Sequence, residues 1–107
     1  MLIDDDPLTN SINKMLIQEA NCADYVVKKE TALSALDYLS LSGNERNNLP
    51  FPNLIFLDVE MPKINGWEFL QYYNGIKDCL SSEPVIYLLS SGEITPPPEN
   101  FNGENFI

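Results

Sequence analysis

The sequence predicts an α/β fold, a doubly wound parallel sheet with helices on its faces. Short apolar runs of strand character alternate along the chain with stretches whose apolar residues recur at helical spacing. Two of the runs, "NLIFLD" and "PVIYLLSS", are continuously apolar, as expected for parallel strands buried on both faces. A length of 107 residues suits one compact domain, so we expect a single domain over residues 1–107.

The composition supports a globular chain and excludes several functions. Apolar residues make up 44% of the chain, which is enough for a core. Sixteen Asp and Glu against six Lys and Arg give a formal net charge of −10, which argues against direct binding of nucleic acid. Histidine is absent, which excludes a His-based triad, a His-ligated zinc site and a histidine phosphoacceptor within this chain. Any chemistry must therefore use carboxylates, hydroxyls and lysines.

The cysteines and the apolar runs indicate where the chain resides. Cys22 and Cys79 lack metal-ligand spacing, so we expect buried free thiols and a cytoplasmic location. No apolar stretch approaches the roughly 20 residues of a membrane span, and no signal-peptide pattern opens the chain. We therefore expect no membrane partner.

The first half of the chain is predicted to form two strand–helix units. "MLIDDDP" reads as a short strand, a loop and a helix start, in which Asp6 caps the helix and Pro7 occupies its first turn. A short strand with a polar exit follows in "ADYVVKKE" (Ala23 to Glu30), with Tyr25 to Val27 at its centre, and then a second helix that ends at Gly43 and Asn44. The first of these helices is amphipathic by its apolar spacing, with Leu8, Ile12, Met15, Leu16 and Ala20 on one side.

The second half continues the alternation and then breaks it. "NLIFLD" and "PVIYLLSS" are strands, and the helix between them, in "GWEFLQYYNGI", is expected to pack Trp67, Phe69 and Leu70 into the core. Gly66 in the loop "MPKING" is expected to permit a positive φ. Three consecutive prolines at 96–98 then exclude an ordinary helix. Only "NFI" at the end offers a fifth strand.

Acidic and hydroxyl side chains stand at the ends of three predicted strands. Asp4 and Asp5 follow the first strand, Asp58 ends the third, and Ser90 follows the fourth. Because the carboxyl ends of neighbouring parallel strands open on one crevice, we expect these groups to meet there. Clustered carboxylates repel one another unless a cation holds them, and Mg²⁺ prefers oxygen ligands. The pattern therefore predicts a magnesium site.

Each acidic motif taken alone also has a simpler interpretation. "DDD" suits a helix N-terminus, where acids are favoured by the helix dipole. Asp58 by itself suits a turn that ends a strand. Three contiguous acids lack the alternating ligands and the glycine of a calcium loop. Only the combination of acids from separate strands favours the metal site over these interpretations.

The motifs "LIDDDP", "LIFLDVEMPKINGWEFL" and "PVIYLLSS", in this order, resemble the receiver domain of two-component response regulators. The resemblance covers most of the chain and is most specific in the central block, with its Asp, Met-Pro and Asn-Gly. It implies a flavodoxin-like receiver fold with strand order 2-1-3-4-5. The fourth and fifth helices of that fold would be disturbed or missing here.

The resemblance also implies roles for the acidic residues. Asp58 matches the phosphoacceptor, which takes a phosphoryl group from the histidine of a partner and becomes an acyl phosphate. Asp4 and Asp5 match the acidic pair that binds Mg²⁺, Asp5 directly and Asp4 chiefly through water. Asp58 would itself be a ligand, and Glu60 would offer its backbone carbonyl.

Two further positions match the family's switch, and one family residue is missing. Ser90 matches the switch hydroxyl, and Phe106 matches the switch aromatic on the fifth strand. The family has a lysine followed by proline just after that strand, whereas this chain ends at Ile107. We expect a domain incomplete at both ends, whose continuation begins with the lysine; the alternative is a receiver with a defective switch face.

Three functions follow from these residues. The first is phosphorelay signalling, in which a histidine kinase or histidine phosphotransfer protein phosphorylates Asp58 with Mg²⁺ and so changes partner binding; this is self-modification and not enzymatic turnover. The alternative is a degenerate receiver that acts as a protein-interaction module without phosphorylation, favoured by the missing lysine. The third is an aspartyl phosphatase, which is disfavoured because Glu60 stands where such enzymes usually have a second Asp.

Overall fold

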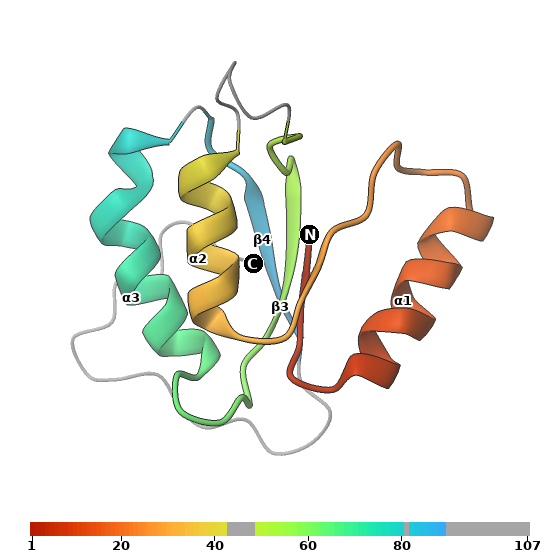
Figure 1. The fold of residues 1–107 in the computed structure, drawn as a ribbon, viewed down its shortest axis with the longest axis horizontal. Helices are drawn as coiled ribbons and strands as arrows, with labels where there is room; N and C mark the ends of the chain where they lie inside the picture. Colours follow the sequence, from red (N-terminus) through yellow and green to blue (C-terminus); the bar gives the residue numbers. More distant parts are fainter. Residues whose placement is uncertain (43–48, 81, 90–107) are drawn as a thin grey trace.

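The computed structural model describes residues 1–42, 49–80 and 82–89. Strands and helices alternate along these residues, as the sequence predicts (Figure 1). In chain order the elements are β1 (Leu2–Ile3), α1 (Pro7–Glu19), β2 (Lys28–Lys29), α2 (Ala32–Leu41), β3 (Leu54–Asp58), α3 (Gly66–Ile76), the 3₁₀ turn η1 (Lys77–Cys79) and β4 (Val85–Leu89).

The four strands form one parallel sheet in the order β2-β1-β3-β4. Leu2 lies between Lys28 and Phe56, and Asp58 at the end of β3 lies opposite Leu89 of β4. The predicted doubly wound parallel sheet and its order 2-1-3-4 are therefore confirmed for these strands. The predicted fifth strand and the segment with the three prolines lie outside the described residues.

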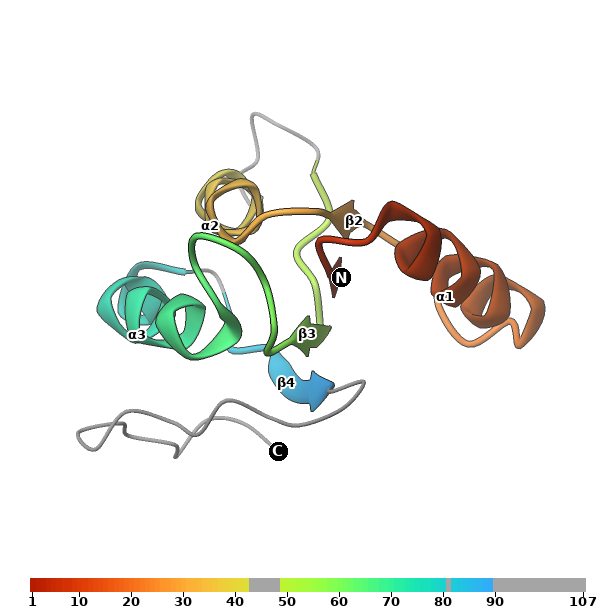
Figure 2. The same cartoon turned by 90° about the horizontal axis from the view of Figure 1, so that it is seen from below.

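The core lies between the sheet and two of the helices. Figure 2 shows α2 and α3 on one face of the sheet and α1 on the other. Alternate residues of β3 and β4, namely Ile55, Leu57 and Ile86, are completely buried at 0% exposure. Phe69 and Tyr73 of α3 are equally buried and belong with them to the core. This packing fixes β3, and with it the acidic residue that ends the strand.

The other face of the sheet is only partly covered within the described residues. Val85, Tyr87 and Leu89 of β4 are 38–46% exposed, and Tyr87 stacks on Phe56 of β3 with ring centroids 5.8 Å apart. The expectation that the strands are buried on both faces therefore holds on one face only. The physical reason is that α1 contacts β1 and β2, whereas β4 lies at the other end of the strand order.

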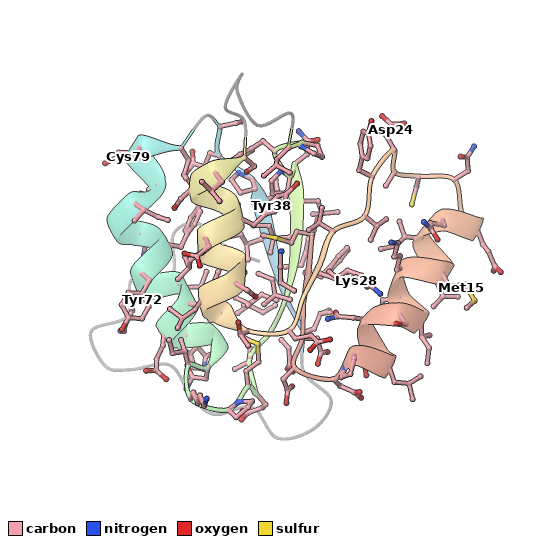
Figure 3. All side chains as sticks on the ribbon, viewed as in Figure 1. Met15, Asp24, Lys28, Tyr38, Tyr72 and Cys79 are labelled. Carbon is pink, nitrogen blue, oxygen red and sulfur yellow. The ribbon has the colours of Figure 1, made fainter. Side chains whose placement is uncertain are left out.

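Helix α1 begins as predicted but turns its polar side to the sheet. The Asp6 carboxylate accepts hydrogen bonds from the Leu8 N–H (3.1 Å) and the Thr9 hydroxyl (2.8 Å), with Pro7 in the first turn. The residue of α1 that is buried is Asn10, and Ile17 is half-buried, whereas four apolar residues are 47–67% exposed: Leu8, Ile12, Met15 and Leu16. Met15 points away from the sheet in Figure 3.

Two local predictions in the connecting segments need correction. The second strand lies within the predicted segment Ala23 to Glu30, but it comprises only Lys28–Lys29 at the polar end and is not centred on Tyr25 to Val27, since β1 offers only two residues to pair with. Cys22 and Cys79 are exposed and not buried, because one follows α1 in a loop, the other ends η1, and connecting segments run over the surface. Among the described residues, every helix is too short or too polar to span a bilayer.

Candidate functional site

Asp4, Asp5 and Asp58 meet at the carboxyl edge of the sheet. One carboxylate oxygen from each of these residues lies within 4.8 Å of the other two. Asp4 and Asp5 follow β1, and Asp58 ends β3. Because β1 pairs in parallel with β3, the residues just beyond the paired ones reach the same edge. The structure thus brings together three acids from two strands, as the sequence predicts.

Main-chain N–H groups hydrogen-bond to two of these carboxylates. The Asp6 N–H donates to Oδ1 of Asp4 at 2.9 Å, and the Glu60 N–H donates to Oδ1 of Asp58 at 3.0 Å. In both cases the donor lies two residues further along the chain, which is the geometry of an Asx turn. Each bond limits the rotation of its carboxylate and engages one oxygen.

The surroundings of Asp4 and Asp58 disfavour the ionised forms of these two carboxyl groups. Burial raises the pKa of Asp58 to about 6, the hydrogen bond from the Glu60 N–H opposes this rise, and the charges of Asp4 and Asp5 add to it. The pKa of Asp4 is also raised, chiefly by burial. A cation bound among the three groups would stabilise their charged forms. The donor set consists of oxygens on partly exposed side chains, which fits Mg²⁺ with some of its water retained.

The loop after β3 folds back tightly against the acidic residue. The Gly66 N–H donates to the Val59 carbonyl at 2.8 Å. A Cβ at position 66 would lie 2.7 Å from the Val59 Cα and 2.8 Å from the Asp58 carbonyl oxygen, too close for any side chain. Glycine is therefore needed for this close approach. The positive φ predicted for Gly66 occurs instead at Lys63, where φ is 65°.

The remaining predicted site residues are less well defined by the structure. Ser90 and Phe106 lie outside the described residues. Glu60 is adjacent to the cluster through its N–H, and the role of its carbonyl as a metal ligand stays a prediction.

Sequence reasoning missed Asn10, whose side-chain amide donates to the Asp4 carbonyl at 2.9 Å and to the Lys29 carbonyl at 3.1 Å. The available signal was its place on α1 opposite the apolar side chains. That position is usually exposed, so the pattern could not identify it.

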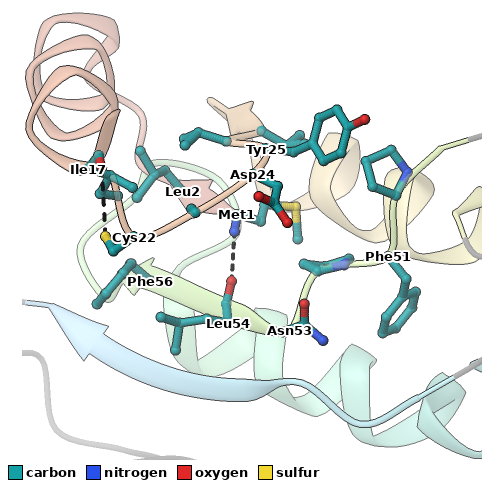
Figure 4. A pocket seen from close by; sticks show the side chains of 15 residues that line it. Met1, Leu2, Ile17, Cys22, Asp24, Tyr25, Phe51, Asn53, Leu54 and Phe56 are labelled. Atoms are coloured by element: carbon teal, nitrogen blue, oxygen red, sulfur yellow. Dashed lines mark hydrogen bonds between the residues drawn. The ribbon is translucent and has the colours of Figure 1, made fainter. Parts of the chain in front are cut away.

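A cavity of about 400 Å³ lies at the opposite edge of the sheet, near the start of β3 (Figure 4). Its walls are mostly apolar and include Tyr25, Phe51, Leu54 and Phe56. In Figure 4 the Met1 amino group points to the Leu54 carbonyl. None of the three clustered acids lines this cavity, so it is separate from the candidate site.

No family model matches the chain, and no curated protein matches its sequence. Solved structures do match it. A response regulator receiver domain protein from Methanospirillum hungatei has 19% identity and a TM-score of 0.71, covering 90% of this chain and 67% of that one. The receiver domain of the histidine kinase CKI1 from Arabidopsis thaliana, complexed with Mg²⁺ and BeF₃⁻, has 19% identity and a TM-score of 0.72, covering 88% and 66%.

A two component response regulator from Cytophaga hutchinsonii is more similar in sequence. It has 27% identity and a TM-score of 0.71, and the match covers 86% of this chain and 67% of that one. The chain thus spans about two thirds of the length of the structures it matches.

Proposed function

Because this chain is a receiver domain by fold, we propose that it acts in two-component phosphorelay signalling. In this proposal Asp58 accepts a phosphoryl group from the histidine of a kinase or of a histidine phosphotransfer protein. The observation that carries the proposal is the meeting of three carboxylates from two strands, with oxygens within 4.8 Å of one another. The similar Arabidopsis receiver was solved with Mg²⁺ and BeF₃⁻, which supports the same chemistry here.

The proposed metal ligands are the three clustered acids and one carbonyl. Asp5 and Asp58 would contact Mg²⁺ directly, Asp4 chiefly through water, and Glu60 through its backbone carbonyl. When bound, the ion supplies positive charge to the oxygens of the phosphoryl group in transfer. The raised pKa values of Asp4 and Asp58 support this assignment, because burial and the neighbouring carboxylates disfavour the charged forms that a cation would stabilise.

Asp58 acts as the nucleophile of the transfer. One of its oxygens forms a bond to phosphorus while the bond from phosphorus to the partner's histidine nitrogen breaks, and that nitrogen keeps the electron pair. The Glu60 N–H holds the other oxygen at 3.0 Å. With a pKa of about 6, the carboxylate is largely ionised at neutral pH and available for attack.

Phosphorylation would then shift the populations of the conformations of the domain, and this shift would change its affinity for a partner. Ser90 and Phe106 are proposed to take part as the switch hydroxyl and the switch aromatic. The chain is modified and later restored, so no turnover of a separate substrate is expected. The proposal includes a cytoplasmic location and a protein as the partner. It also includes no direct contact with nucleic acid, which the net charge of −10 supports.

The test is phosphorylation by a small donor. The full chain is incubated with Mg²⁺ and acetyl phosphate, and we expect a mass gain of one phosphoryl group that EDTA prevents. Asp58→Asn should abolish this gain, and Asp37→Asn, the same change at an exposed acid of α2, should retain it. An unmodified wild-type chain, or a gain that persists in Asp58→Asn, would refute the proposal and favour a receiver that acts without phosphorylation.

A further inference from the structure

Helix α1 is attached to the sheet through a buried polar side chain. Asn10 is 2% exposed and is the buried residue of this helix, whose apolar side chains are exposed except for the half-buried Ile17. Its amide nitrogen donates to two main-chain carbonyls, that of Asp4 at 2.9 Å and that of Lys29 at 3.1 Å. The two hydrogen bonds of Asn10 therefore contribute to the contact between α1 and the sheet, beside the packing of Ile17.

The two carbonyls belong to the carboxyl ends of β1 and β2. Each of these strands has only two residues, so their ladder contains few backbone hydrogen bonds. The Asp4 N–H already donates to the Lys29 carbonyl at 3.0 Å. The amide of Asn10 extends this ladder by one step and joins both strand ends to the helix. Only a group with two N–H donors satisfies two carbonyls at once.

We propose that Asn10 is a positioning residue for the acid cluster, and this inference rests on the proposed function. Asn10 holds the carbonyl of Asp4, while the Asp6 N–H holds its carboxylate at 2.9 Å. The main-chain carbonyl and the side chain of Asp4 are then both held by hydrogen bonds. This sets the direction in which the chain continues to Asp5. Loss of the Asn10 amide would let the end of β1 move relative to Asp58.

A second observation supports a role beyond stability. Oδ1 of Asn10 is buried without a hydrogen-bond partner. An unpaired buried acceptor destabilises a fold; an apolar residue would remove this acceptor, but it would also take the amide N–H away from the Asp4 and Lys29 carbonyls. Residues that break such a local rule are expected at functional sites. The amide of Asn10 is therefore explained by what it holds in place.

The experiment compares Mg²⁺ affinity in the full chain by calorimetry, well below the unfolding temperature of every variant. Asn10→Leu keeps the branched outline of the side chain and removes both donors, and Asn10→Ala is the second variant should the bulkier Leu prevent folding. Ser42→Ala is the matched control, since Ser42 is the other buried polar residue among those described and lies at the far end of α2. Ile86→Val controls for a general loss of stability.

We expect the Asn10 variants to bind Mg²⁺ roughly tenfold more weakly, and both controls to bind as wild type does. In metal-free samples, the carbonyl carbon resonance of Asp4 should shift in Asn10→Leu and not in Ser42→Ala. If wild type binds Mg²⁺ and a folded Asn10 variant binds it equally well, the positioning role is refuted while the proposed function stands. If wild type does not bind Mg²⁺, the proposed function fails and the positioning role fails with it.

Discussion

Replacement of Asp58 by Asn should stabilise the metal-free chain. The pKa of Asp58 is raised from 3.8 to about 6, chiefly by burial. One pKa unit corresponds to about 1.4 kcal/mol, so this difference gives an upper limit of about 3 kcal/mol. Because Asp58 is only partly buried, solvent screens part of that energy, and we expect a gain of about 1–2 kcal/mol in the free energy of unfolding. The hydrogen bond from the Glu60 N–H can be kept by the Asn oxygen.

The gain should depend on pH in a defined direction. The folded-state pKa of Asp58 lies above its unfolded value, so folding disfavours the ionised carboxylate. This destabilisation is fully present above pH 6 and disappears as the pH falls below about 4, where the group is protonated in both states. Asn carries no charge at any of these pH values. The difference between Asp58→Asn and wild type should therefore shrink from pH 7 to pH 4.

The assay is thermal or urea unfolding of both proteins in EDTA and in Mg²⁺. In EDTA at pH 7 we expect the variant to melt at least about 4 °C higher. Added Mg²⁺ should raise the melting temperature of wild type more than that of the variant, because the ion stabilises the fold that binds it. Asp37→Asn should change stability by less than about 0.5 kcal/mol. A less stable Asp58→Asn in EDTA, or a difference that grows as the pH falls, would refute the electrostatic argument.

Three further substitutions test the structure around the site. Gly66→Ala should destabilise the fold by about 1–3 kcal/mol in urea unfolding, because its Cβ meets the backbone of Val59 and Asp58; unchanged stability would contradict the close approach. Asn65→Ala removes the N-cap of α3 and should cost about 1 kcal/mol in the same assay. Tyr73→Phe removes a buried hydroxyl without a hydrogen-bond partner, so calorimetry should show equal or higher stability; a clear loss would indicate a partner for that hydroxyl.

The acidic site was predictable to the extent that it depends on the ends of strands. Asp4 and Asp58 follow directly on an apolar run and Asp5 comes next after Asp4, and parallel strands place such residues at one edge. The contribution of Asn10 was not predictable, because it depends on carbonyls that come together only when α1, β1 and β2 are in place. The requirement for Gly66 was predicted for the wrong reason, since the close approach to Val59 is a tertiary contact.

The sequence by itself determined the alternation of strands and helices, the N-cap of α1 and the set of acids that meet. These features depend on periodicity and on neighbours a few residues away, which a linear pattern records. Only the tertiary structure decided which side of α1 faces the sheet, that both cysteines are exposed, and how far burial raises the pKa of Asp58. Each of these depends on the solvent excluded by segments distant in the chain, and burial of that kind is a property of the assembled fold.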